Sequence, residues 1–169
     1  MNYTCFKSSF RWVGVARSLR GISRAVFGQS TETEVEEFLL SEVEATKSDE
    51  GLSEVVNLLG RYFNGERVDF DLDLDLRSGT DFQRTVWNAT YHIPYGEVRS
   101  YSWIAREIGK PQAMRAVGGA QGANPVPIII PCHRVLRSDG GLGGYSGGLH
   151  WKPKLLALER ETQSKQQRC

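Results

Sequence analysis

The chain has 169 residues, of which 40% are hydrophobic and 24% charged, a composition typical of a globular protein with one ordinary domain or two small ones. It has no apolar stretch of the roughly 18 residues that a membrane span needs and no secretory signal pattern, so we expect a cytoplasmic protein, or a nuclear one in a eukaryote. The net charge of +1 hides an asymmetry, because residues 1–79 carry 9 basic and 14 acidic side chains, whereas residues 80–169 carry 12 and 6.

The first thirty residues alternate loosely between apolar and polar side chains, in FRWVGVARS and GISRAVFGQ with Gly21 between them, which predicts antiparallel strands. Thr31 then opens a helical pattern with acidic residues in its first turn, where the helix dipole favours them. A second helix is expected from Leu52 to Phe63. Together these elements predict a small α/β domain in the amino-terminal half.

The segment VDFDLDLDLRSG, residues 68–79, alternates apolar side chains with aspartates so regularly that we expect it to be extended. It is either an edge strand or an acidic linker. Because the composition changes here, we place the domain boundary at this segment, which divides the chain into residues 1–79 and 80–169.

The carboxy-terminal half begins with a predicted helix, since Thr80 and Gln83 have the spacing of a capping box. Two short helices are expected next, SYSWIAREIG ended by Gly109 and KPQAMRAVGGAQG with Pro111 at its first position, and together they predict a helix-turn-helix. The last helix is expected from about Pro153. A basic half that carries such a motif fits a domain that faces a polyanion, although scattered solvated charge explains the charge count equally well.

Three glycines, Gly118, Gly119 and Gly122, weaken the second helix of the motif by up to about 1 kcal/mol each relative to alanine. Small side chains there must serve another purpose. They allow either close packing of a neighbouring helix or close approach to a ligand as bulky as a duplex.

The segment IIIPCHRV, residues 128–135, places Cys132 beside His133 after a run of isoleucines that predicts a short buried strand ended by Pro131. In the last helix, Glu159 lies on the apolar stripe, where an unpaired carboxylate is unfavourable. His133 is the expected partner, which makes Cys132, His133 and Glu159 a nucleophile, a base and an orienting group. The alternative is a small buried cysteine beside a structural histidine.

The remaining cysteines and glycines carry weaker signals. Cys5, Cys132 and Cys169 lie far apart and suggest neither a disulfide framework nor a zinc site. The segment SDGGLGGYSGG, residues 138–148, is either a plain hairpin turn or a loop whose amides can approach a ligand.

The stretch NPVPIIIPCHRV, preceded by RAVGGA and followed by GGYSGG, resembles the active-site region of the O6-alkylguanine-DNA alkyltransferases, also called methylated-DNA–protein-cysteine methyltransferases. The resemblance runs without a gap from about Phe82 to Glu159, whereas the amino-terminal half matches in outline, chiefly around RYFNGE. It implies an α/β (α+β) fold, with a small amino-terminal α/β domain followed by a mostly helical domain that contains a winged-helix-like helix-turn-helix.

The resemblance implies a role for each matching residue. Cys132 would accept the alkyl group, activated through a water by His133 and Glu159, while Asn124 would hold the recognition helix against the active-site strand and Tyr101 would donate a hydrogen bond to a flipped guanine. The implied DNA-binding residues are Ser100, Met114, Arg115, Ala116 and Gly118, with Arg115 filling the gap left by the extruded base. The implied base pocket consists of Pro127, Val135, Tyr145, Ser146 and Gly147, with Pro127 and Tyr145 as walls and the amides of Val135 and Ser146 near the guanine oxygen.

The implied activity is direct-reversal DNA repair, in which the alkyl group of O6-alkylguanine moves irreversibly to Cys132. Each molecule would act once, because water has no carbonyl to attack in a thioether. The implied partner is double-stranded DNA, bound through its minor groove by a monomer, with no membrane involved. We expect no cofactor and no zinc, since Cys5 and His92 are the cysteine and histidine that precede the active-site pair. Activity on O4-alkylthymine and the range of alkyl groups stay open.

Three other functions compete with this one. An alkyltransferase-like protein would recognise the lesion without removing it, but such relatives lack the cysteine. A helix-turn-helix regulator would not need the Cys-His-Glu set. A thiol hydrolase would turn over, which a mass measurement distinguishes from a single transfer.

Overall fold

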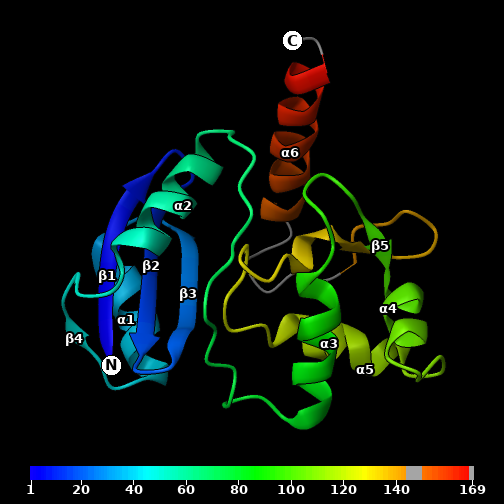
Figure 1. Cartoon of the computed structure of the whole chain (residues 1–169), viewed down its shortest axis with the longest axis horizontal. Helices are drawn as coiled ribbons and strands as arrows, with labels where there is room; N and C mark the ends of the chain where they lie inside the picture. The colour runs from blue at the N-terminus through cyan, green and yellow to red at the C-terminus, as the bar shows by residue number, and fades with distance from the viewer. Residues whose placement is uncertain (144–149, 168–169) are drawn as a thin grey trace. The chain divides into compact units, whose positions relative to one another are not determined.

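The computed structural model describes residues 1–143 and 150–167. The chain divides into two compact units, Met1–Leu76 and Arg77–Cys169, which are coloured from blue to green and from green to red in Figure 1. Each unit has its own secondary structure and its own core. In the part of the chain that is described, no helix combines the length and the apolar character needed to cross a membrane.

The amino-terminal unit contains a four-stranded sheet in the order β3-β2-β1-β4. Its strands are β1 (Asn2–Ser8), β2 (Arg11–Ser18), β3 (Gly21–Gln29) and β4 (Thr46–Lys47). The first three are antiparallel, as the alternation predicts, and β4 pairs in parallel with β1. Gly21 has a φ of +149°, and a Cβ there would lie 2.3 Å from the carbonyl oxygen of Asp73, so this corner requires glycine.

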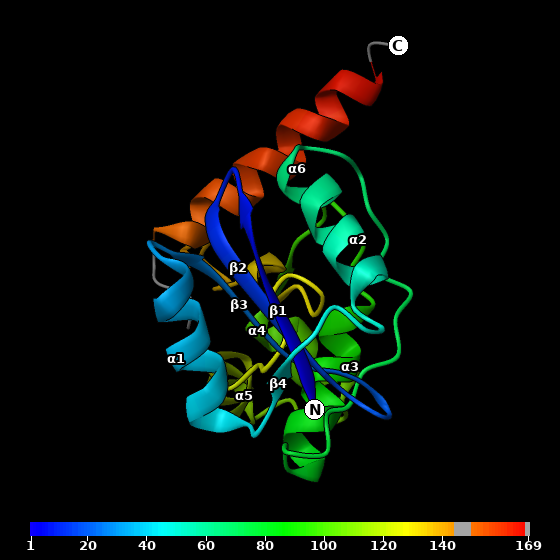
Figure 2. The same ribbon diagram turned by 90° about the vertical axis from the view of Figure 1, so that its left-hand side faces the viewer.

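Helices α1 (Glu32–Glu42) and α2 (Ser53–Phe63) cover opposite faces of this sheet (Figure 2). On one face, Val35 and Leu39 of α1 pack with buried residues of the strands. On the other, the ring of Phe63 lies 6.0 Å from that of Phe27 in β3. Helix α1 begins after Thr31, whose side chain accepts a hydrogen bond from a backbone N–H of the first turn, as the sequence predicts.

The acidic segment at residues 68–79 is neither a regular edge strand nor a fully detached linker. Val68 and Phe70 are buried while Asp69 is exposed, so its alternation reflects burial on one side. Its pairing with the sheet is limited to one parallel bridge, between Leu74 and Ile22 of β3, flanked by two backbone hydrogen bonds. The backbone groups of Asp73 and Asp75 therefore anchor this segment to Ile22 at the edge of the sheet, and Asp75 is itself buried.

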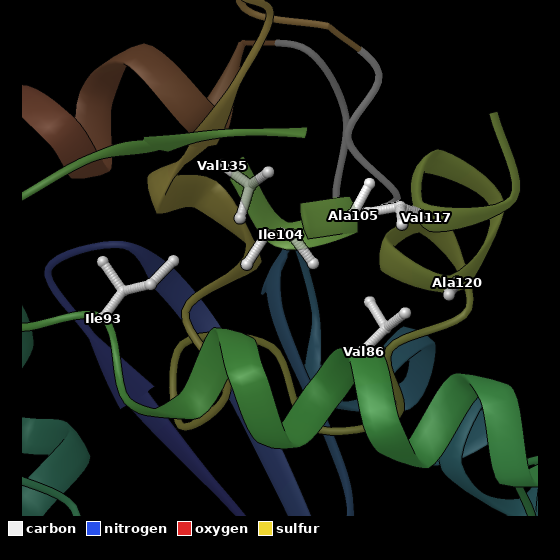
Figure 3. Close-up of a cluster of buried hydrophobic side chains, with 7 residues drawn as sticks. All are labelled: Val86, Ile93, Ile104, Ala105, Val117, Ala120 and Val135. Carbon is white, nitrogen blue, oxygen red and sulfur yellow. The ribbon is translucent and has the colours of Figure 1, made fainter. Parts of the chain in front are cut away.

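The carboxy-terminal unit, in which three helices surround a small apolar core, is mostly helical. Its elements are α3 (Asp81–Tyr91), β5 (Arg99–Ser100), α4 (Tyr101–Glu107), α5 (Met114–Gly122), a 3-10 turn η1 (Cys132–Arg134), β6 (Val135–Leu136) and α6 (Trp151–Gln167). Figure 3 shows the core between α3, α4 and α5, formed by Val86, Ile93, Ile104, Ala105, Val117, Ala120 and Val135. A small α/β unit followed by a helical unit confirms the predicted fold class.

Local signals fix the start of α3. The side chain of Thr80 accepts a hydrogen bond from the N–H of Gln83, and the Gln83 side chain accepts one from the N–H of Thr80, which is the predicted capping box. The Trp87 indole of the same helix donates to the carbonyl of Ala120 at 2.7 Å. This last contact ties α3 to α5, the second helix of the motif.

The turn between α4 and α5 differs in detail from the prediction. Helix α4 ends at Glu107 and is followed by Gly109, whose φ is +69°. The N–H of Lys110 donates to the carbonyl of Ala105 at 2.8 Å, a Schellman arrangement. Pro111 does not start α5, as the sequence analysis expected. It lies in a turn closed by a hydrogen bond from Ala113 to Lys110, where proline is favoured, and the helix begins at Met114.

Two further expectations need correction. Residues 128–130 are buried, but they form a turn and not a strand, because Ile128 has a φ of +75° and the N–H of Ile130 donates to the carbonyl of Val126. An apolar run reports burial without fixing backbone geometry. The last helix begins at Trp151 and not near Pro153, since proline is tolerated within the first turn of a helix.

Candidate active site

Cys132 lies at the start of η1, directly after the buried turn at residues 128–130. Its side chain is 2% exposed, and its Sγ accepts a hydrogen bond from Nδ2 of Asn124 at 3.1 Å. Asn124 also donates to the carbonyl of Ile130 at 2.9 Å and accepts from the N–H of Val126 at 3.0 Å. One amide therefore holds both the turn and the sulfur, where the sequence analysis expected it to hold a helix against a strand.

His133 and Glu159 meet in the interior, as the sequence analysis predicts for the carboxylate. Nε2 of His133 lies 2.6 Å from Oε1 of Glu159, and the two side chains are 0% and 1% exposed. The pairing joins η1 to the middle of α6, 26 residues further along the chain. A carboxylate on the apolar stripe of α6 is thus accommodated by a partner on η1.

Two further groups bind the same carboxylate, and the sequence analysis missed both. Nε and Nη2 of Arg134 each donate to Glu159 at 3.0 Å, and Nη1 donates to the carbonyl of Ile93 at 2.7 Å. The backbone N–H of Gly96 donates to Oε2 at 3.0 Å. The guanidinium of Arg134 was visible in the sequence as the residue after His133, whereas nothing local signalled the contribution of Gly96.

The protonation states of this cluster follow from its partners. Burial alone raises the pKa of the Glu159 carboxyl, but the hydrogen bonds from His133 and Arg134, together with the charge of Arg134, outweigh it and hold that pKa at about 2. Burial lowers the pKa of His133 despite the adjacent carboxylate, which keeps the imidazole neutral. Because an ionised carboxylate only accepts, Nε2 of His133 carries the proton and Nδ1 is the basic nitrogen.

The sulfur of Cys132 rests as a thiol. Burial raises the pKa of Cys132, and the hydrogen bond from Asn124 together with the charge of Lys152 opposes that rise. A buried thiol is a poor nucleophile until its proton is taken, so this site needs a base. His133, the next residue, supplies a neutral imidazole.

Tyr101 lies beside this centre, at the first position of α4. Its side chain is half-buried, and burial followed by the nearby Cys132 raises the pKa of its phenol, so the hydroxyl stays a donor. Ser100 caps the helix by accepting a hydrogen bond from the N–H of Trp103 at 3.0 Å. A Cβ on Gly143, whose φ is +67°, would lie 2.6 Å from the Tyr101 hydroxyl, so the backbone of the glycine-rich segment closely approaches that group.

Four of the five predicted DNA-binding residues lie in α5, and the fifth, Ser100, is the cap of α4. Met114, Arg115 and Ala116 are exposed, and Gly118 is half-buried. A Cβ at Gly118, Gly119 or Gly122 would meet no atom within 4 Å, so packing inside the protein does not require glycine at these positions. Among the described residues these glycines therefore do not serve close packing of a neighbouring helix, and close approach to an external ligand stays a prediction.

The structure describes two of the five predicted pocket residues. Pro127 is half-buried beside the turn that precedes Cys132, while the side chain of Val135 is in the core shown in Figure 3. The N–H of Val135, expected near the guanine oxygen, donates instead to the carbonyl of Cys132, so this amide is already used within the protein. Tyr145, Ser146 and Gly147 lie outside the described residues.

One group among the described residues offers three metal-ligating atoms close together, namely Cys5, Glu32 and Glu36 in the amino-terminal unit. The ammonium of Lys47 lies 2.6 Å from Glu32 and 2.7 Å from Glu36 and already supplies positive charge there. Burial raises the pKa of Cys5 to about 11, which disfavours the thiolate that a metal would require. The residues of this cluster therefore do not favour a cation.

Comparison with protein families accounts for nearly the whole chain. The family described as 6-O-methylguanine DNA methyltransferase, ribonuclease-like domain, matches residues 1–76, and the one described as 6-O-methylguanine DNA methyltransferase, DNA binding domain, matches residues 81–161. A methylated-DNA–protein-cysteine methyltransferase of Mycolicibacterium paratuberculosis is 55% identical over 115 residues, which cover 68% of this chain and 69% of that protein. A protein of the same name from Mycobacterium bovis is 56% identical over 64% of this chain and 65% of its own length.

Solved structures extend the similarity to both units. The Mycobacterium tuberculosis protein OGT, solved in complex with DNA, is 41% identical, with a TM-score of 0.82 over 96% of this chain and 94% of that chain. The O6-methylguanine-DNA methyltransferase of Pyrococcus kodakaraensis is 26% identical, with a TM-score of 0.70 over 93% and 98%.

Proposed function

The chain belongs to the 6-O-methylguanine DNA methyltransferase family, and we propose that it repairs DNA by transferring the alkyl group of O6-alkylguanine to its own Cys132. The observation that carries this proposal is two buried pairs, Asn124 with Cys132 and His133 with Glu159, which adjoin because Cys132 and His133 are consecutive residues, in the unit that also contains the helix-turn-helix. A structural cysteine would need neither a neutral imidazole as its neighbour nor a carboxylate that fixes the tautomer of that imidazole.

The transfer begins with removal of the thiol proton. Nε2 of His133 is engaged by Glu159, so Nδ1 takes the proton of Cys132, through a bridging water because neighbouring side chains rarely point the same way. Asn124 keeps the sulfur in place by its hydrogen bond at 3.1 Å. The thiolate then attacks the alkyl carbon in line with the bond to O6.

The bond changes balance without a cofactor. A sulfur–carbon bond forms, the carbon–oxygen bond breaks, and its electron pair passes to the guanine. Tyr101 stabilises the charge developing on the base by donating its hydroxyl hydrogen, since its raised pKa keeps it protonated. The proton that Cys132 lost restores neutrality in the guanine, so that the products are a thioether and ordinary guanine.

The reaction occurs once per molecule. A thioether has no carbonyl for water to attack, and the repaired base is a poor alkyl donor. The added group also lies against Asn124 and the close-packed turn, where overpacking destabilises a folded protein by about 1–3 kcal/mol. The spent protein is therefore both inactive and less stable.

Helix α5 supplies the DNA-facing surface. Open space beside Gly118, Gly119 and Gly122 lets this helix lie close in the minor groove of a duplex, where contacts are largely independent of sequence. The exposed Arg115 fills the gap left when the damaged base is extruded, with Met114 and Ala116 beside it and Ser100 at the start of α4. A monomer suffices for this arrangement, because one chain holds both the recognition helix and the nucleophile.

Intact-mass measurement tests the proposal. The protein is incubated with a duplex that contains O6-methylguanine, and we expect a gain of one methyl group in the wild type and in a Cys5→Ser control, but not in Cys132→Ser. Unmodified protein with tight binding would indicate an alkyltransferase-like or regulatory module, and repaired DNA without protein modification would indicate a hydrolase. A second duplex that contains O4-methylthymine measures the breadth of substrates.

A further inference from the structure

One peptide group, between Tyr95 and Gly96 in the turn that leads from α3 to β5, is bound at both ends by α6. Its carbonyl accepts a hydrogen bond from Nε2 of Gln163 at 3.0 Å, and its N–H donates to Oε2 of Glu159 at 3.0 Å. Because Glu159 and Gln163 are four residues apart in α6, they lie about one helical turn from each other on the same face. Helix α6 therefore holds this peptide group between two of its side chains.

The contact with Gln163 requires glycine at position 96. Gly96 has a φ of +77°, and a Cβ there would lie 2.1 Å from Nε2 of Gln163 and 2.2 Å from its Cδ. The side-chain amide of Gln163 therefore lies directly against the backbone of the turn. The proposed reaction gives this amide no role.

The carboxylate of Glu159 divides its two oxygens among several donors. Oε2 accepts hydrogen bonds from Gly96 and from Nε of Arg134, each at 3.0 Å, while Oε1 lies 2.6 Å from Nε2 of His133. The N–H of Gly96 is a better donor when the carbonyl of the same peptide group is itself hydrogen-bonded, because consecutive hydrogen bonds polarise one another. The hydrogen bond from Gln163 therefore strengthens a bond to the carboxylate that orients the base.

We propose that Gln163 is a positioning residue for alkyl transfer, which acts through this peptide group to hold Glu159 in the orientation that keeps the proton of His133 on Nε2. This inference rests on the proposed function. An imidazole whose proton is on Nδ1 cannot accept the thiol proton of Cys132 at that nitrogen. A positioned general base contributes roughly 10²–10⁴-fold to a rate, so partial loss of its orientation is expected to slow the reaction about tenfold.

The direct test replaces Gln163 with methionine, which has a similar length and no donor. The matched control is Gln166→Met, at an exposed position on the same helix. The ring nitrogens of histidines labelled with nitrogen-15 report the tautomer by NMR. We expect His133 to carry its proton on Nε2 in the wild type and in Gln166→Met, and to populate both tautomers in Gln163→Met. An unchanged tautomer in a folded Gln163→Met protein would overturn the proposal.

The reactivity of the sulfur gives a second readout. The pH dependence of Cys132 methylation by methyl iodide is followed by peptide mass spectrometry. We expect Gln163→Met to react about tenfold more slowly than wild type at about pH 7.5. In alkaline solution, where the thiol ionises without a base, the two rates should converge. An unchanged rate would contradict the proposal, and so would a rate lowered equally at every pH, which indicates a general packing defect.

An isosteric variant covers the case in which Gln163→Met does not fold. Gln163→Glu keeps the shape of the side chain but, at neutral pH, places a carboxylate, which only accepts, against the carbonyl of Tyr95. It should show the same mixture of tautomers, whereas Gln166→Glu, which adds the same charge elsewhere on the helix, should not. A Gln163→Glu protein with the His133 proton on Nε2 alone would refute the proposal. None of these measurements uses DNA, so a wild type that fails to take methyl from O6-methylguanine would refute the proposed substrate without affecting this result.

Discussion

Replacing Glu159 with glutamine tests the cluster at the centre of the site. The carboxylate accepts hydrogen bonds from His133, Arg134 and the backbone of Gly96, and a neutral amide of the same shape cannot accept all of them. The pKa of Glu159 falls from 4.5 to about 2 on folding, which corresponds to about 3 kcal/mol of stability. Breaking one partner out of a buried pair has a similar effect, about 3–5 kcal/mol.

The pH dependence of that loss identifies its cause. Because the pKa of Glu159 is lower in the folded than in the unfolded state, the stabilisation is complete above about pH 4.5 and is lost as the pH falls toward 2. We expect Glu159→Gln to be about 3 kcal/mol less stable at pH 7 and the difference from wild type to shrink progressively below pH 4.5. Methyl transfer should fall at least a hundredfold, since the imidazole loses the group that fixes its tautomer.

Urea denaturation at several pH values, followed by tryptophan fluorescence, measures the loss. Three of the four tryptophans lie in the carboxy-terminal unit, so the signal reports mainly on the part that contains the site. The matched control is Glu161→Gln, at an exposed position on the same helix, which should change stability little. A Glu159→Gln protein as stable as wild type, or a loss that does not vary between pH 7 and 3, would refute the reasoning.

Three other substitutions probe the neighbourhood. Gly118→Ala adds a Cβ that meets nothing within 4 Å, so thermal unfolding should show that the protein is about 0.5–1 kcal/mol more stable. The affinity for a DNA duplex, measured by fluorescence anisotropy, should fall, and an unchanged affinity would count against a DNA-facing role. Gln121→Met removes a buried Oε1 that lacks a hydrogen-bond partner in the described residues, and it also removes the hydrogen bond to Thr90. Denaturation should show a free energy of unfolding higher by up to about 1 kcal/mol, and a large decrease would contradict this reasoning. Asn124→Ala should lose about 2–3 kcal/mol and move the alkylation profile of Cys132 to higher pH, and a profile left in place would contradict the role of its hydrogen bond to sulfur.

Features written in short stretches of sequence were predicted well. The structure confirms the capping box at Thr80 and Gln83, the termination of α4 by Gly109 just after the helix, and the antiparallel strands at the start of the chain. Each of these features depends on neighbouring residues. The prediction of a strand at the isoleucine run, residues 128–130, was wrong, because apolar composition indicates burial but not backbone geometry. Its turn is set by the side chain of Asn124, which no periodicity reveals.

The part of the site that was predictable is the part that follows from the need to pair a buried charge. A carboxylate on the apolar stripe of α6 required a partner, which led from Glu159 to His133, and the structure brings the two together. Arg134, Gly96 and Lys152 were missed because their roles depend on contacts between distant segments. The buried position of Lys152 follows from the packing of α6 against the site, and lysine in a sequence normally indicates a solvated surface.

The most direct test of the account locates the transferred carbon. A duplex whose O6-methyl group carries deuterium is mixed with the protein in increasing excess, and the protein is then digested and analysed by mass spectrometry. The account predicts one labelled methyl group per molecule, attached to the sulfur of Cys132, however large the excess of DNA. A labelled methyl group on another residue would contradict the account. So would an amount of repaired DNA larger than the amount of protein, with Cys132 unmodified.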